Sequence, residues 1–185
     1  SVAVFRDPTS HYFIDLISNG TTVKAYVNNV EVLSYTGTIT NLNSAIAHSI
    51  GRHAAGANQY LDGYLSRIAF VDGTALTPSS FGYFNTEINE WVSKSQSAVK
   101  AVVDAGGTNS FMLDFDDATS LTTLGYDKSS KGNNWTLNNF SLTAGTSYDW
   151  MLDVPGNSYA TLKPLMFRYS TGHATKSEAN LKTTN

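Results

Sequence analysis

Apolar and polar positions alternate in short runs along the first part of the chain. A near-continuous apolar run covers 11–17, an alternating segment covers 22–28, and a third run covers 30–35. Asn19-Gly20 and Asn28-Asn29 separate these runs and favour tight hairpin turns, because both residue types tolerate positive φ. Three apolar residues of the middle segment share one face: Val23, Ala25 and Val27. The pattern predicts a three-stranded antiparallel meander.

The next long apolar segment differs because it is apolar on both faces. It covers 60–72, follows a turn or bulge at Asp62-Gly63 and ends at Asp72-Gly73. Such a segment is typical of a central strand, so residues 1–73 are predicted to be almost wholly strands and hairpins. Thr77–Phe81 then predicts a single helical turn, with Thr77 as N-cap and Pro78 at the first helical position.

Helical spacing appears only in the middle of the chain. Apolar residues between 85 and 104 recur at helical spacing, most securely over 95–104, and Gly106-Gly107 would end that helix. Strand character resumes over 110–116, where the apolar and acidic residues alternate. A polar loop and further strand residues follow over 125–142.

Periodicity fades after about residue 145. The sequence therefore predicts a mostly β fold over 1–145, an antiparallel sandwich or jelly roll with one short helix, and an extended C-terminal arm over 146–185. The sandwich is expected to be incomplete or permuted. The chain begins with a strand-like segment and without a methionine, which is expected of a processed or truncated start.

Composition excludes several classes of protein. Charged residues make up 15% of the chain, net charge is −3, and no basic stretch is present, so nucleic-acid binding is disfavoured. The absence of cysteine excludes disulfides and thiolate metal sites. No apolar run approaches the roughly 20 residues that cross a bilayer, so no membrane span is expected.

Three clustered carboxylates are the candidate chemical site: Asp114, Asp116 and Asp117. Asp114 and Asp116 are expected to share one strand face, which would suit a glycosidase pair or a Ca²⁺ ion. The alternative is the solvated face of an edge strand. No Glu-x-Asp-x-Glu strand is present, so the sequence favours a protein that is not an enzyme and needs no cofactor, with Ca²⁺ left open.

Exposed aromatic residues are the second candidate site, because sugar rings stack on them. The aromatic residues nearest to turns are Tyr60, Tyr64, Trp91 and Trp135. Each of them could instead pack in the core. Arg52 and His53, in the loop over 51–59, form a further candidate binding surface.

Several segments resemble one family. The hairpin Val23–Asn29 and the segment Tyr60–Ile68 are similar to laminin-G/concanavalin A-like lectin domains. The blocks 70–82, 107–115 and 124–135 resemble bacteriophage tail and tail-fibre proteins, in which such blocks occur in this order. The chain departs from the family in its longer, more helical segment over 85–106 and in lacking the first sandwich strands before Ser1. Strand 110–116 is accordingly expected to join the sheet that contains 64–71, in permuted order.

This resemblance implies a non-catalytic structural protein of the virion, a tail fibre or tail-associated module. Its lectin-like sandwich would contact host-surface glycan or serve assembly, and its partners would be other virion proteins, with a homotrimer as one possibility. Two alternatives are a fragment of a glycan-degrading enzyme and a bacterial extracellular carbohydrate-binding module.

Overall fold

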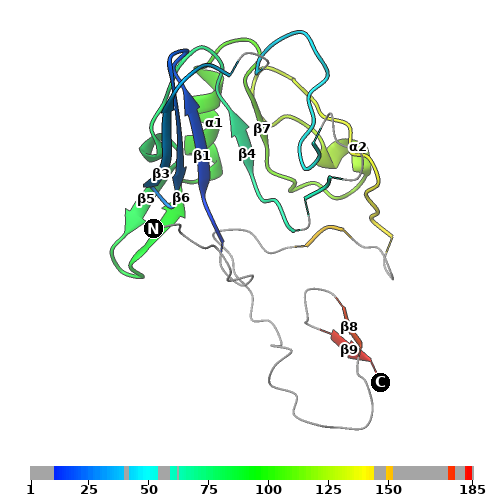
Figure 1. The fold of residues 1–185 in the computed structure, drawn as a ribbon. Helices are drawn as coiled ribbons and strands as arrows, with labels where there is room; N and C mark the ends of the chain where they lie inside the picture. The colour runs from blue at the N-terminus through cyan, green and yellow to red at the C-terminus, as the bar shows by residue number, and fades with distance from the viewer. Residues whose placement is uncertain are drawn as a thin grey trace.

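A computed structural model describes residues 11–39, 42–53, 59–61, 63–143 and 149–151, and the backbone of two short strands near the C-terminus. The described part is mostly β, with small antiparallel sheets and few helices (Figure 1). The strands are β1 (Ile14–Ser18), β2 (Thr22–Val27), β3 (Val30–Thr36), β4 (Ile68–Phe70), β5 (Gly82–Asn85), β6 (Glu90–Ser93), β7 (Phe111–Leu113), β8 (Thr175–Ser177) and β9 (Lys182–Thr184). The helices are η1 (Pro78–Ser80), α1 (Gln96–Asp104) and α2 (Leu121–Leu124).

The predicted three-stranded meander is confirmed. β1, β2 and β3 form an antiparallel sheet in that order. Gly20 has a φ of 87°, and Asn28 and Asn29 have φ values of 49° and 64°, as the predicted tight turns require. The register shifts between Ala25 and Tyr26, which marks an irregularity in the middle of β2.

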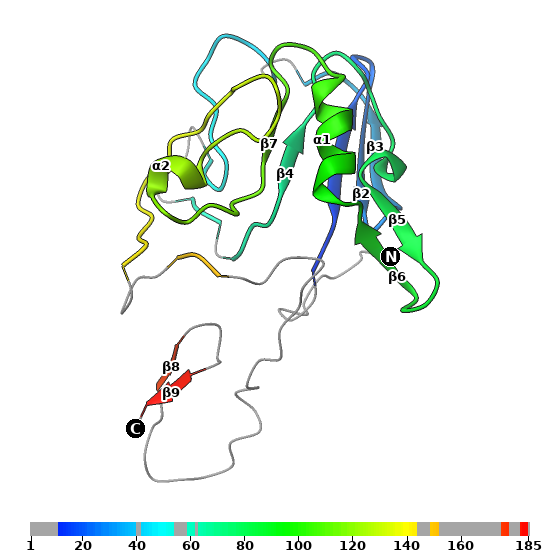
Figure 2. The same ribbon diagram turned by 180° about the vertical axis from the view of Figure 1, so that it is seen from behind.

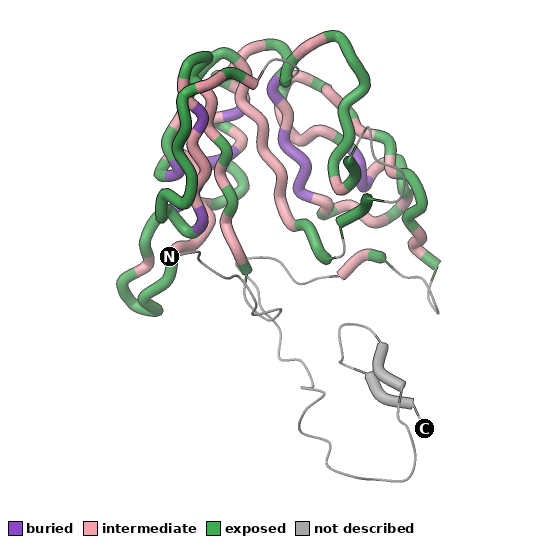
Figure 3. The backbone as a smooth tube through the Cα atoms, viewed as in Figure 1, coloured by how far each residue is buried: buried purple, intermediate pink, exposed green. Residues whose placement is uncertain are grey.

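The main apolar core lies around β4, β7 and α1. β4 pairs with β7 in antiparallel register, so the expected joining of these two segments is confirmed. The core consists of Val99 and Val103 on α1 and Met112 on β7, with Ala69, Val71 and Phe81 packed against them. Figure 2 shows α1 beside β4, and Figure 3 shows the buried stretch of β7 running through the molecule.

The sheets are smaller than predicted. Among the described residues, β4–β7 has two strands and is separate from β1–β3, so a complete sandwich or jelly roll is not formed there. The predicted central strand over 60–72 is wrong: its regular part is β4 alone, and β4 has one partner in the described part of the chain. The positive φ of Arg67, 32°, interrupts extended backbone immediately before Ile68. Residues 45–51, which lie within the predicted strand region, are bends and irregular backbone rather than strand.

The segment 82–93 is a β-hairpin, so the helix predicted over 85–104 is wrong in its first half. β5 pairs with β6, with Phe84 opposite Trp91. Asn85 Oδ1 accepts a hydrogen bond from the Glu87 amide at 2.9 Å, and Asn89 has a φ of 56°; both features build a tight turn. Local turn chemistry and cross-strand aromatic pairing therefore decide the structure over the helical spacing of single apolar residues.

The second half of that prediction is confirmed, because α1 occupies 96–104. Ser95 Oγ accepts a hydrogen bond from the Ala98 amide at 3.3 Å, which satisfies one of the unpaired amides at the helix start. The predicted turn at 78–80 is also present, with Pro78 in its first position. Thr77 is its N-cap residue, but its hydroxyl contacts Ser79 Oγ at 2.8 Å instead of capping a backbone amide.

Asp127 joins two of the sequence blocks that carry the resemblance to phage proteins. Its Oδ1 accepts hydrogen bonds from the amides of Met112 and Ser129, each at 2.8 Å. Its Oδ2 accepts from Ser129 Oγ and from the Asn133 amide, also at 2.8 Å each. One carboxylate thus closes the loop over 127–133 and fixes it to β7.

A second side chain, Asn133, completes the connection. Its Nδ2 donates to the carbonyl oxygens of Thr108 and Ser110, each at 2.8 Å. Ser110 Oγ accepts from the Asp72 amide at 3.0 Å, and the Gly107 amide donates to the Asp72 carbonyl at 2.9 Å. The three blocks are therefore one hydrogen-bonded unit, although they lie far apart in the sequence.

Two further features concern the ends of the described structure. β8 pairs with β9, so a short hairpin lies within the segment predicted to be an extended arm; most of 146–185, like the boundary at 145, falls outside the described residues. The longest helix described, α1, has nine residues, and no helix in the described part could cross a membrane.

Candidate functional site

The loop over 51–61 is closed into a hairpin by backbone pairing. Arg52 and Tyr60 form an antiparallel bridge. The His53 amide donates to the Gln59 carbonyl at 3.0 Å, and the Leu61 amide donates to the Gly51 carbonyl at 2.8 Å. The tip, 54–58, lies outside the described residues. The pairing brings together Arg52 and Tyr60, two of the residues that the sequence singled out separately.

The side chains of this pair form an exposed cation–aromatic surface. The Arg52 guanidinium carbon lies 5.9 Å from the centre of the Tyr60 ring. An exposed contact of this type contributes about 0.5–1 kcal/mol, enough to orient both side chains. Tyr60 is 58% exposed, and Tyr64, four positions later, is 81% exposed. His53 is exposed as well.

This arrangement suits the recognition of a polar ring. A tyrosine ring offers a flat apolar face to the C–H side of a sugar, and its hydroxyl can donate or accept a hydrogen bond. The guanidinium adds five donors in a plane, which match sugar hydroxyls and carboxylates. The Arg52–Tyr60 surface therefore places an apolar ring face beside a planar cationic donor group.

The two tryptophans of the predicted site make packing contacts and are partly buried. Trp135 packs on Phe111 with ring centres 4.9 Å apart, and its amide donates to the Gly125 carbonyl at 2.9 Å. A Cβ at Gly125 would lie 2.1 Å from the Trp135 carbonyl oxygen, so the two backbones are in close contact. Trp91 is half-buried opposite Phe84, with its indole over the backbone of β5. For both tryptophans, packing is the role that their contacts support.

Asp114 is buried, which contradicts a solvated strand face. Arg67 Nε lies 2.5 Å from Asp114 Oδ1, and Arg67 Nη1 also donates to Ser93 Oγ and to the Lys94 carbonyl, each at 2.9 Å. The other carboxylate oxygen, Oδ2, is buried without a hydrogen-bond partner among the described residues. This pair connects the start of β4 to the ends of β6 and β7.

The neighbouring carboxylates serve other contacts. Asp116 pairs with Lys128 Nζ at 2.7 Å and accepts from Gln96 Nε2 at 3.1 Å. Partial burial alone would raise the pKa of Asp116, but these two contacts outweigh it and lower the pKa. Asp117 accepts from the Thr119 hydroxyl at 2.6 Å and from its amide at 3.1 Å, and both bonds lower the pKa of Asp117.

The predicted shared face of Asp114 and Asp116 is therefore wrong. β7 ends at Leu113, and Phe115 has a φ of 54°, so strand alternation does not continue through 114–116. Within the described ranges, no three His, Cys, Asp or Glu side chains lie close enough to hold a metal ion.

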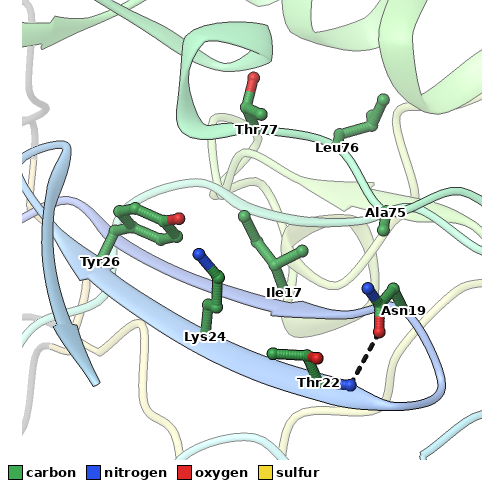
Figure 4. A pocket seen from close by; sticks show the side chains of 8 residues that line it. All are labelled: Ile17, Asn19, Thr22, Lys24, Tyr26, Ala75, Leu76 and Thr77. Carbon is green, nitrogen blue, oxygen red and sulfur yellow. Dashed lines mark hydrogen bonds between the residues drawn. The ribbon is translucent and has the colours of Figure 1, made fainter. Parts of the chain in front are cut away.

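A cleft that the sequence did not predict lies between the β1–β3 sheet and the segment 75–77 (Figure 4). Its volume is about 320 Å³. The lining residues are Ile17, Asn19, Thr22, Lys24, Tyr26, Ala75, Leu76 and Thr77. Lys24 Nζ and Tyr26 Oη both bond to Glu31 Oε2, at 2.8 and 3.1 Å. Along β2, Lys24 and Tyr26 lie on one face and Val23 lies on the other. This alternation was the signal in the sequence for the polar face.

Comparison with known proteins does not assign the chain. No protein-family model, no curated protein and no solved structure matches it. The resemblance to lectin domains of phage tail proteins therefore stays a prediction, and the geometry above is the basis for any functional proposal.

Proposed function

We propose that this chain is a non-catalytic structural module of a bacteriophage tail or tail fibre that contacts acidic glycans of the host surface. The exposed Arg52–Tyr60 pair is the observation that carries this proposal. An aromatic ring that is more than half exposed and lies beside a cation matches the chemistry of sugar recognition.

The assignment to phage tails rests on the three sequence blocks over 70–82, 107–115 and 124–135. Each block alone is a weak signal. Their hydrogen bonds through Asp127 and Asn133 support the proposal, because they make the blocks parts of one folded unit and not separate coincidences. The expected partners remain other virion proteins.

A binding experiment tests the glycan contact. Host lipopolysaccharide or capsule is immobilised, and retention of the whole chain is compared with that of Tyr60→Ala and Arg52→Ala. Losing one stacking or cation contact is expected to weaken retention about threefold to tenfold. Tyr83→Ala is the matched control, since Tyr83 is similarly exposed (48%) but lies on β5.

The same incubation tests the non-enzyme part. Retention without release of reducing ends supports an adhesive module. Release of reducing ends would instead make the chain part of a glycan-degrading enzyme. Equal retention of all variants and the control would show that the Arg52–Tyr60 surface does not bind the glycan. Copurification with virions, without retention on glycan, would leave assembly as the function.

A further inference from the structure

The polar and apolar faces of the β1–β3 sheet are the reverse of the usual arrangement. Its polar face points toward segment 75–77, and its apolar face points away from it. Residues paired across neighbouring strands lie on one face. The face toward segment 75–77 carries charged side chains, in the row Asp15–Tyr26–Glu31 and at Lys24. An antiparallel sheet with one solvated face normally exposes its polar side and buries its apolar side.

The opposite face, the outer face, is almost wholly apolar. Three cross-strand rows form it: Ser18–Val23–Tyr35, Leu16–Ala25–Leu33 and Ile14–Val27–Val30. No residue in these rows is charged. Five large side chains of the outer face lie on the two edge strands, β1 and β3, and are between 46% and 74% exposed: Ile14, Leu16, Val30, Leu33 and Tyr35. A contiguous apolar patch of this kind marks an interaction surface.

We propose that the outer face binds the same face of a second copy of this chain, so that two three-stranded sheets form a sandwich across a two-fold axis. This interface does not depend on the proposed glycan contact. An uncharged face offers no complementarity to a charged partner, but it can pack against itself without burying any unpaired charge.

The accessible part of the outer face lies on its two edge strands. The central strand β2 contributes small residues, of which Val23 and Val27 are buried, while larger side chains of β1 and β3 rise on either side. Because Val23 and Val27 are only 2% and 9% exposed, a second copy placed by two-fold symmetry would contact mainly the side chains of β1 and β3. Each copy then makes the same contact that it receives, as an isologous interface requires.

The area is sufficient for a specific pair. The exposed parts of the five large side chains amount to roughly 500 Å² per copy, so two faces would remove about 1,000 Å² from water, near the lower limit for a specific interface. Dissociation in the micromolar range is expected for an interface of this size.

Light scattering with size-exclusion chromatography on the whole chain tests this. Over roughly 1–100 µM, the mass is expected to rise from the 20.0 kDa of one chain toward twice that value. Leu16→Glu places a charge in the interface and is expected to weaken pairing at least about tenfold. Ile88→Glu is the matched control, because Ile88 is similarly exposed (55%) in the β5–β6 turn.

A second variant, Leu33→Glu, covers the case in which Leu16→Glu unfolds the chain, as circular dichroism would reveal. Loss of pairing in a folded outer-face variant, with pairing kept in Ile88→Glu, supports the interface. A monomeric wild type at every concentration overturns the proposal, as does a trimeric mass. Pairing that survives both outer-face variants also overturns it, because the contact would then lie elsewhere.

Discussion

Two regions of the molecule contain similar apolar residues but differ in how far these are exposed. One is the region around β4, β7 and α1, and the other is the β1–β3 sheet. In the first region, Met112 and Val103 have no exposed surface, and partly buried polar side chains such as Asp127 and Asn133 join distant segments. In the sheet, comparable side chains such as Leu16 and Val30 remain mostly exposed. The first region is stabilised by its own contacts, whereas the large side chains on the edge strands of the sheet have no covering layer among the described residues.

The largest difference is expected from truncating one apolar side chain in each region. Met112→Ala removes a completely buried side chain and should lower the free energy of unfolding by about 2–5 kcal/mol. Leu16→Ala at low protein concentration should change it by less than about 0.5 kcal/mol, because Leu16 is already in water. Denaturant titration measures both. Equal losses would show that the sheet carries as much of the core as β7 does.

A smaller effect is expected from the buried ion pair. Arg67→Ala leaves Asp114 buried without its cation, and should cost about 2–3 kcal/mol, less than for a wholly buried pair because a quarter of the Arg67 side chain is exposed. Adding Asp114→Asn to that variant should recover part of the loss, since the unpaired charge is removed. No recovery in urea unfolding would mean that Arg67 acts through its packing or its bonds to β6.

The Asp127 contacts should contribute less again. Asp127→Ala leaves the Met112 and Asn133 amides without an acceptor and is expected to cost about 1–3 kcal/mol. Asp117→Ala is the comparison, because Asp117 bonds only to nearby residues such as Thr119, and its loss should cost about 0.5 kcal/mol. The two variants are compared by thermal unfolding. Equal losses of stability would contradict the special role of Asp127.

The smallest expected effect lies on the inner face of the sheet. Burial raises the pKa of Asp15 above its usual value, so ionisation of Asp15 disfavours the folded state. That penalty is complete above the folded pKa and absent below the unfolded one. Asp15→Asn should therefore raise the melting temperature slightly at about pH 7 and not at about pH 3. An unchanged or lowered melting temperature at neutral pH would contradict the burial of this carboxyl group.

Features with a local cause could be predicted from the sequence. The Asn19-Gly20 and Asn28-Asn29 turns fixed the β1–β3 meander, and the end of α1 before Gly106 followed from helical spacing and a glycine pair. The hairpin over 82–93 was missed because Ile88 and Trp91 stand three positions apart, a spacing that a helix and a four-residue turn both allow. Tyr83 lies opposite Val92, and Phe84 lies opposite Trp91. These cross-strand pairs can be recognised only once the two strands are placed side by side.

Features that depend on distant contacts could not be predicted. Asp114 and Arg67 are separated by 47 positions, and nothing near either residue indicates that they pair. The strand pattern over 110–116 suggested a carboxylate face because it gave no sign of the positive φ at Phe115. In the candidate binding surface, residue type alone selected Arg52 and Tyr60, but also Trp91 and Trp135, which are partly buried against other side chains. Exposure, which the sequence does not contain, separated the two groups.

Hydrogen exchange measured by mass spectrometry at low and at high protein concentration tests the central contrast most directly. Amides of α1 and β7 are expected to exchange slowly at both concentrations, because their stability arises within one chain. Amides of β1–β3 are expected to exchange quickly when the protein is dilute and to slow when copies pair through the outer face. Protection of β1–β3 that equals that of β7 and does not change with concentration would contradict the account.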